Sequence, residues 1–219
     1  MVVRTMLGVC YVGPRNPRAF LVLDRLHPYG ASQILRLQQP NPESWIFWDY
    51  AGRLGALAIL AAIPSARAVA FRSERLRIVR WEEVAFWIVG VVLASRLLGV
   101  LVGRTINTVF PATVLGTYPR LSGWLYSIDI VFGLALVAYS EEILFRRCAR
   151  HIFSFYMDDG YALVIITSVL FGAYHWWTGV GNIVAVAMMG VLLMLFVRRS
   201  AALWPVVLAH YLIDIIEFS

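Results

Sequence analysis

Long apolar blocks constrain this chain more than any other feature of its sequence. They recur from about residue 50 to the C-terminus, and the 219-residue sequence is 60% hydrophobic with a mean hydropathy of +0.73. Soluble globular domains are closer to half apolar. A helix needs roughly 17–25 apolar residues to cross the hydrocarbon core of a bilayer. The pattern therefore predicts an all-α fold, a polytopic bundle of transmembrane helices.

We expect about six spans, separated by turns that contain glycine, proline or charged residues. They cover residues 50–71, 84–103, 121–142, 161–178, 182–197 and 201–218. The first of them contains Pro64, so it could be a re-entrant or interfacial helix rather than a full crossing.

These spans divide the chain into three parts. Residues 1–50 contain several prolines and no sustained period, which predicts an extramembrane segment to which the sequence assigns no role. Residues 51–120 hold the first transmembrane helices and a loop. Residues 121–219 form a membrane core that holds most of the polar residues buried within apolar sequence.

The basic residues are all arginine, and they cluster beside the apolar spans. The formal net charge is +6, and the clusters lie at residues 67–80, 146–150 and 198–199. Cytoplasmic flanks of membrane helices are enriched in Arg and Lys, so we expect these clusters on the cytoplasmic side. This distribution favours the lipid bilayer over nucleic acid as the partner. We expect an integral protein of the cytoplasmic (inner) membrane of a prokaryote.

Two adjacent glutamates end the third predicted span. Glu142 and Arg146 are four residues apart, so they share a helix face and can form an ion pair, which could be purely structural. Glu141 points about 100° away from Glu142 and has no basic partner on its own helix. Ionisable groups within membrane spans are costly and mark functional sites by default. Glu141 is therefore a candidate general acid or base.

Two histidines lie in the fourth and sixth predicted spans. His175 occurs in FGAYH, and His210 precedes Asp214 by four residues in HYLID, which places that pair on one helix face. Each histidine taken alone could be a packed structural residue. If the helices bring Glu141, His175 and His210 together, a carboxylate and two imidazoles would form a site that activates water.

Three motifs in this order resemble those of a protease family. EEILFR (141–146), FGAYH (171–175) and HYLID (210–214) match Glu-Glu-x-x-x-Arg, Phe-x-x-x-His and His-x-x-x-Asn/Asp. Their order and separation resemble the CPBP family of intramembrane proteases, also called the CAAX-protease and bacteriocin-processing or Abi family. The resemblance covers about residues 120–218. It implies that the C-terminal half is a catalytic membrane core and that the substrate is a membrane-associated protein or peptide.

The resemblance also implies a role for each motif residue. Glu141 and His175 would activate water as in a glutamic-type endopeptidase, and His210 would stabilise the oxyanion with Asp214 as its partner. Glu142, Arg146 and Phe171 would support them. Family members with Asn at the last position can donate a hydrogen bond there, whereas an ionised Asp214 only accepts. Asp214 must then be protonated, orient His210 or ligate a metal.

Two alternatives to a metal-independent protease remain open. Glu141, His175, His210 and Asp214 are residue types that bind zinc, although the sequence has no HExxH motif, so we expect no cofactor. The polar cluster could also line a transport pathway or hold together a non-catalytic scaffold. No inverted repeat argues for transport.

Overall fold

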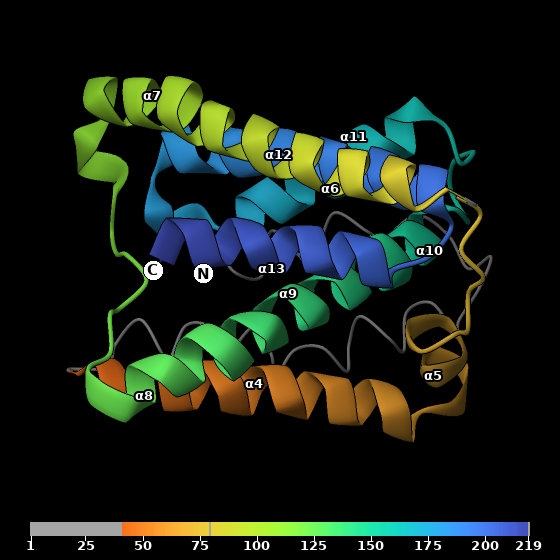
Figure 1. Ribbon diagram of the computed structural model, residues 1–219, viewed down its shortest axis with the longest axis horizontal. Helices are drawn as coiled ribbons and strands as arrows, with labels where there is room; N and C mark the ends of the chain where they lie inside the picture. The colour runs from red at the N-terminus through yellow and green to blue at the C-terminus, as the bar shows by residue number, and fades with distance from the viewer. Residues whose placement is uncertain (1–40, 79, 219) are drawn as a thin grey trace.

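Helices make up almost all of the chain that can be described. The computed structural model describes residues 41–78 and 80–218, and no strand occurs in this part (Figure 1). The helices are α4 (Pro42–Ala62), α5 (Pro64–Ala70), α6 (Trp81–Leu98), α7 (Arg104–Val109), α8 (Gly123–Ile128), α9 (Leu134–Glu142), α10 (Arg150–Phe153), α11 (Tyr161–Tyr174), α12 (Val180–Ser200) and α13 (Trp204–Phe218). The predicted all-α class is confirmed.

Stretches of π-helix join several of these elements into longer rods. Gly99–Gly103 links α6 to α7, Asp129–Gly133 links α8 to α9, and Ile143–Ala149 links α9 to α10. The third predicted span is thus the first part of a continuous helix that runs to Phe153. Its last π-helical stretch begins directly after the glutamate pair. π-Helical turns inside α-helices are frequent at functional sites.

The expected number of six spans is not confirmed. By length and composition, two described helices can cross a membrane, Trp81–Val109 and Val180–Ser200. A third is obtained if α4 and α5, which are bent by 113° at Pro64, count as one broken span. Helix α11 is apolar but has only 14 residues.

The first described helix begins earlier than the sequence suggested. Pro42 occupies its first turn, and the Asn41 side chain caps it by accepting a hydrogen bond from the Ser44 amide at 2.8 Å. Residues 42–50 are therefore helical, not irregular. The rest of the predicted extramembrane segment, residues 1–40, lies outside the described residues.

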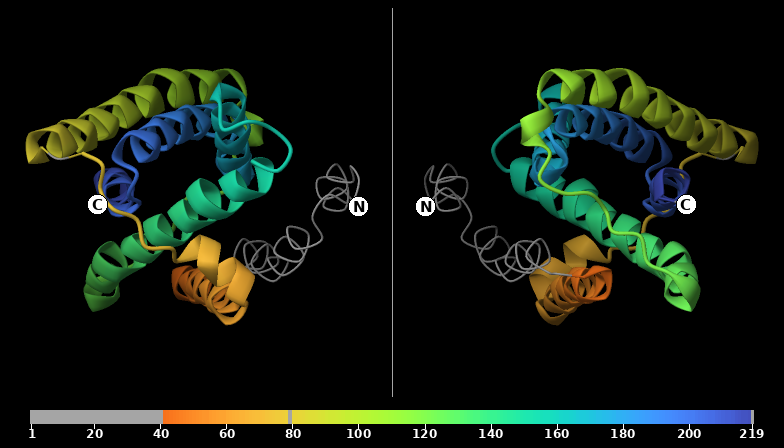
Figure 2. Two further views of the ribbon diagram at one scale, coloured as in Figure 1. Left: turned by 90° about the vertical axis from the view of Figure 1, so that its right-hand side faces the viewer. Right: turned by 90° about the vertical axis from the view of Figure 1, so that its left-hand side faces the viewer.

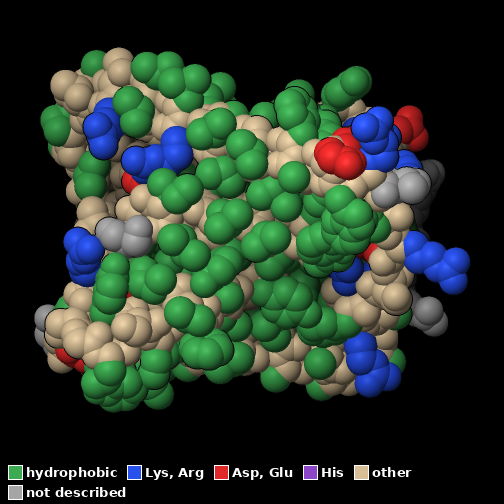
Figure 3. Space-filling model, viewed as in Figure 1, with side chains coloured by type: hydrophobic (Ala, Val, Ile, Leu, Met, Phe, Trp, Pro, Cys, Tyr) green, Lys and Arg blue, Asp and Glu red, His purple; other side chains and the backbone are tan. Residues whose placement is uncertain are grey.

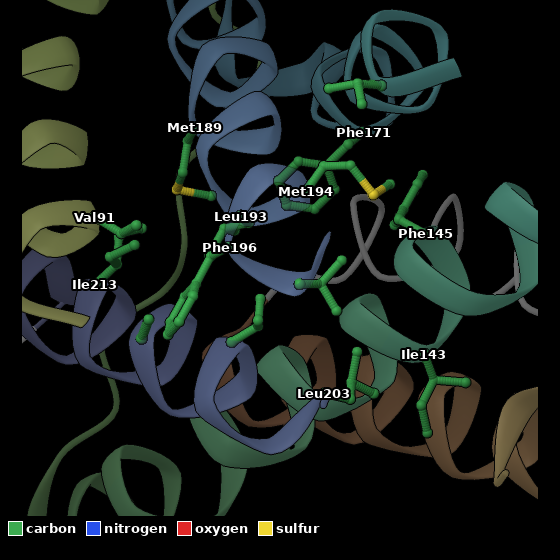
Figure 4. Packing of buried hydrophobic residues seen from close by; sticks show 14 of the residues in the cluster. Val91, Ile143, Phe145, Phe171, Met189, Leu193, Met194, Phe196, Leu203 and Ile213 are labelled. Atoms are coloured by element: carbon green, nitrogen blue, oxygen red, sulfur yellow. The ribbon is translucent and has the colours of Figure 1, made fainter. Parts of the chain in front are cut away.

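Helix α12 contacts α6, α7, α11 and α13 and supplies several residues of the main apolar core. α6 and α12 lie on one side of the molecule and α4 on the opposite side, with α9 and α13 between them (Figures 1 and 2). Leu193, Met194 and Phe196 of α12 are fully buried in the core, near Phe171 (Figure 4). A Cβ added at Gly172 would lie 2.4 Å from the backbone oxygen of Ile183, so only glycine permits this approach of α11 to α12.

The surface has the distribution expected of a bundle embedded in lipid. Hydrophobic side chains cover the middle of the face in Figure 3, and charged side chains lie towards its two ends. Large side chains such as Phe86, Leu93 and Trp124 are more than half exposed. The arginine clusters at residues 67–80, 146–150 and 198–199 all lie at one end of the bundle, on the right in Figure 1, which we call the arginine-rich end. The chain is an integral membrane protein.

Candidate active site

The residues predicted from the three motifs converge at one buried place. Glu141 and Glu142 end α9, His175 follows directly after α11, and His210 lies in α13. Both glutamates and His210 are at most 2% exposed. Because three separate elements supply these groups to one apolar interior, the site depends on tertiary packing and not on any single motif.

Glu141 presents one carboxylate oxygen to two imidazoles. Its Oε2 lies 4.0 Å from His175 Nε2 and 3.9 Å from His210 Nε2, and it has no hydrogen-bond partner among the described residues. Both separations are too long for direct hydrogen bonds. They suit a small polar molecule that contacts all three atoms at once.

The other oxygen of Glu141 is held by an arginine from the first helix. Arg53 of α4 approaches Oε1 through Nη2 at 2.9 Å. The same guanidinium pairs with Asp49 at 2.8 Å and donates to the Ser140 hydroxyl at 3.0 Å. Arg53 is 2% exposed and Asp49 is fully buried. This network fixes the Glu141 carboxylate so that Oε2 faces the histidines.

His175 is the more accessible of the two imidazoles. Its Nδ1 lies 2.9 Å from the backbone carbonyl of Phe171, which can only accept, so Nδ1 carries the proton of this hydrogen bond. The lone pair of the neutral ring is then on Nε2, the nitrogen that faces Glu141. The His175 side chain is 20% exposed, against 3% for His210. The His175 side of the site is therefore the more open one.

Glu142 links His210 to Arg146. His210 Nδ1 lies 2.9 Å from Glu142 Oε1, and Arg146 Nε donates to Glu142 Oε2 at 2.9 Å. The predicted Glu142–Arg146 pair is present. Asp214, which the sequence offered as the residue that orients His210, lies 3.7 Å from Nε2. Glu142 is thus the closer partner of the ring and contacts its other nitrogen.

Phe171 forms the apolar side of the site, against which both imidazoles pack. It is fully buried and meets the His175 and His210 rings edge-to-face, with centroids 5.2 and 5.8 Å apart. The guanidinium carbon of Arg146 lies 4.7 Å from the centre of its ring. Both imidazoles and the arginine are held against one aromatic side chain, which limits their rotation.

Sequence reasoning missed Arg53 and Asp49, although a signal was available. The two are four residues apart in an otherwise apolar helix, the same spacing that identified Glu142 and Arg146. A second buried cluster supports them: the hydroxyls of Tyr50 and Tyr118 both donate to the buried Asp129 Oδ1. This cluster ties α4 to the helix that contains the glutamates.

The described residues contain no group of three or more His, Cys, Asp or Glu side chains arranged to hold a metal ion. Glu141 uses one oxygen to bind Arg53, and Glu142 uses both for His210 and Arg146. Three of the four glutamate oxygens are thus engaged by arginine or histidine.

Comparison with known proteins gives one match. Residues 122–216 match the family described as type II CAAX prenyl endopeptidase Rce1-like. This segment contains all three motifs and ends just before the C-terminus, whereas Arg53 and Asp49 lie outside it. Neither the curated proteins nor the solved structures include a match to the chain.

Proposed function

Because residues 122–216 belong to the Rce1-like family of CAAX proteases, we propose that the chain is an intramembrane endopeptidase. It would hydrolyse a peptide bond of a membrane-associated protein or peptide. The observation that carries this proposal is the position of Glu141 Oε2, without a hydrogen-bond partner among the described residues and about equally far from two imidazole nitrogens.

In this proposal Glu141 and His175 activate the attacking water. The water donates to Glu141 Oε2 or His175 Nε2 as its oxygen bonds to the scissile carbonyl carbon. That proton then passes to the leaving nitrogen as the C–N bond breaks, and the second proton of the water stays on the new carboxyl group, which yields a carboxylic acid and an amine. Arg53 acts as a positioning residue because it holds the other oxygen of Glu141 at 2.9 Å.

His210 would stabilise the tetrahedral intermediate. Glu142 occupies its Nδ1, so the Nε2 side is directed to the reacting atoms and can donate to the oxyanion when protonated. Asp214 lies 3.7 Å from the same nitrogen, and its Oδ2 is buried without a partner among the described residues. After a small movement it could bond to His210 or to substrate. Exclusion of bulk water strengthens each of these interactions.

The decisive experiment is proteolysis by the purified full-length chain in lipid vesicles. Membrane-anchored peptides, including a prenylated one with a CAAX tail, would be incubated with the parent and with His175→Ala, with and without a strong chelator. The proposal predicts cleavage that is lost in His175→Ala and unchanged by the chelator.

Three results would each contradict a part of this proposal. Loss of cleavage on chelation, with recovery on adding zinc, would favour the metal-dependent reading. Undiminished cleavage by a folded His175→Ala would contradict the role given to that imidazole. Solute uptake that depends on membrane potential, in a chain that cleaves none of the peptides, would favour a transporter.

A further inference from the structure

Arginines from three parts of the chain surround a pocket at the arginine-rich end. The pocket has a volume of about 330 Å³, near the lower limit for small-molecule sites. Its charged lining residues are Arg72, Arg77, Arg146, Arg147, Arg150, Arg198, Glu74 and Asp159. Six arginines against two carboxylates give a formal charge of +4, or +3 when the Glu142 carboxylate bound to Arg146 is included.

Arg146 distinguishes this pocket from an ordinary basic surface. Its side chain is fully buried, and only Nε has a partner, Glu142. Nη1 and Nη2 are buried without a hydrogen-bond partner among the described residues. Buried donors in folded proteins are almost always hydrogen-bonded, so two buried donors without a protein partner are candidates for binding a ligand. Stacking on Phe171 offsets only part of this cost because a ring face accepts no strong hydrogen bond.

The other arginines differ in how many partners they have. Arg147 is bound to the Ala70 carbonyl at 2.7 Å and to Glu74 at 3.1 Å, but its buried Nε has no partner in the described part of the chain. The exposed Arg77 makes no side-chain hydrogen bond or ion pair within that part. The pocket therefore offers unused donors from several directions, with Arg146 at its buried end.

We propose that this pocket binds a phosphate group, carried by an anionic phospholipid headgroup or free in solution. Guanidinium groups bind phosphate oxygens through paired, charge-assisted hydrogen bonds. Donors that converge from several elements suit the several oxygens of a phosphate better than the two of a carboxylate. Basic pockets between membrane helices on the cytoplasmic side are typical phospholipid headgroup sites.

The site is coupled to the proposed active site through one side chain. Arg146 bonds to Glu142, and Glu142 bonds to His210, both at 2.9 Å. A phosphate on Nη1 and Nη2 would fix the guanidinium and, through Glu142, the ring of His210. This consequence rests on the proposed function: occupancy should raise kcat and leave KM nearly unchanged.

The test is a thermal melt of the full chain, which needs no catalytic activity. The chain would be placed in vesicles of phosphatidylcholine, of phosphatidylcholine with phosphatidylglycerol, or of phosphatidylcholine with oleate, whose negative charge is a carboxylate. A fourth sample would add inorganic phosphate to phosphatidylcholine vesicles. Arg77→Gln and Arg198→Gln remove lining arginines, and Arg104→Gln removes an exposed arginine at the opposite end.

We expect phosphatidylglycerol to raise the melting temperature well beyond the effect of oleate. Each lining substitution should weaken binding about fivefold and remove most of the rise, and Arg104→Gln should retain it. An equal rise with inorganic phosphate would identify free phosphate as the ligand. The proposal is overturned if no phosphate-bearing sample raises the melting temperature, if oleate acts as well as phosphatidylglycerol, or if Arg104→Gln loses as much as the lining variants. None of these outcomes depends on cleavage, so a failed proteolysis assay would leave this test intact.

Discussion

Arg53 should contribute more to stability than any exposed arginine of the chain. It lies between two buried carboxylates, with Nε 2.8 Å from Asp49 and Nη2 2.9 Å from Glu141, and its side chain is 3% exposed. Arg53→Met keeps most of the side-chain volume but leaves both carboxylates without this cation. Breaking a buried ion pair in this way costs about 3–5 kcal/mol. Whole domains are stable by only about 5–15 kcal/mol, so the variant should be clearly weakened.

The measurement is equilibrium unfolding in mixed micelles, by a denaturant titration of the parent and its variants. A matched control is Arg67→Met, because Arg67 is an exposed arginine of α5 whose loss should change the unfolding free energy by less than about 0.5 kcal/mol. A second variant, Arg53→Met with Asp49→Asn, removes one of the stranded charges. The unfolding free energy of this double variant should be roughly 0.5–3 kcal/mol higher than that of Arg53→Met alone, which is the size of coupling typical of residues in contact.

Either of two results would refute this reasoning. One is an unfolding free energy for Arg53→Met equal to that of Arg67→Met. The other is an unfolding free energy of the double variant that is no higher than that of Arg53→Met alone, which would mean that Asp49 is not left as an unpaired buried charge.

Three further predictions follow from individual contacts. Gly172→Ala should lower the unfolding free energy by about 1–3 kcal/mol because the added Cβ would overlap α12. Gly55→Ala is the control: its Cβ meets open space, so the change should be neutral or stabilising by up to about 1 kcal/mol. The same denaturant titration measures both variants. Under the proposed function, Glu142→Gln should lower kcat for peptide cleavage roughly 10²-fold or more with little change in KM, since it weakens the hydrogen bond that orients His210, the imidazole proposed to bind the oxyanion. An unchanged kcat would contradict this. Hydrogen bonds from Arg150 hold the pKa of Asp159 below its ordinary value, so this pair stabilises the fold above about pH 4 and the contribution is lost as pH falls through the lowered folded-state pKa. Because the Asp159 side chain is 45% exposed, Asp159→Asn should flatten the acid side of the stability–pH curve by less than about 1 kcal/mol, and an unaltered curve would count against the pair.

Local spacing predicted the parts of the site that lie within one helix. Glu142 and Arg146 are paired as their separation of four residues requires, and the histidines were found because ionisable side chains are rare in apolar spans. The same reasoning named Asp214 as the partner of His210. It shares a helix face with His210, but the ring nitrogen at hydrogen-bond distance faces Glu142, 68 residues away. A cross-helix partner outcompetes the local one, and no periodicity within a helix reveals this.

The contact between Arg53 and Glu141 could not be predicted for the same reason. It joins helices 88 residues apart in the chain, and only the packing of α4 against α9 brings them together. The expected number of six spans is not confirmed because apolar composition does not determine helix length. Helix α11 ends at Tyr174, before its apolar sequence does, and within the third predicted span a π-helical segment with the buried Asp129 joins α8 to α9.

The most direct test of the proposed function is the turnover of Glu141→Gln. The variant would be compared with the parent and with Glu217→Gln, which changes an exposed glutamate near the C-terminus, on one cleavable membrane peptide, after all three show the same melting behaviour. The account predicts normal cleavage by Glu217→Gln and none detectable by Glu141→Gln. Cleavage by a folded Glu141→Gln at the parental rate would contradict it, because the carboxylate oxygen between the two imidazoles would then have no part in the chemistry.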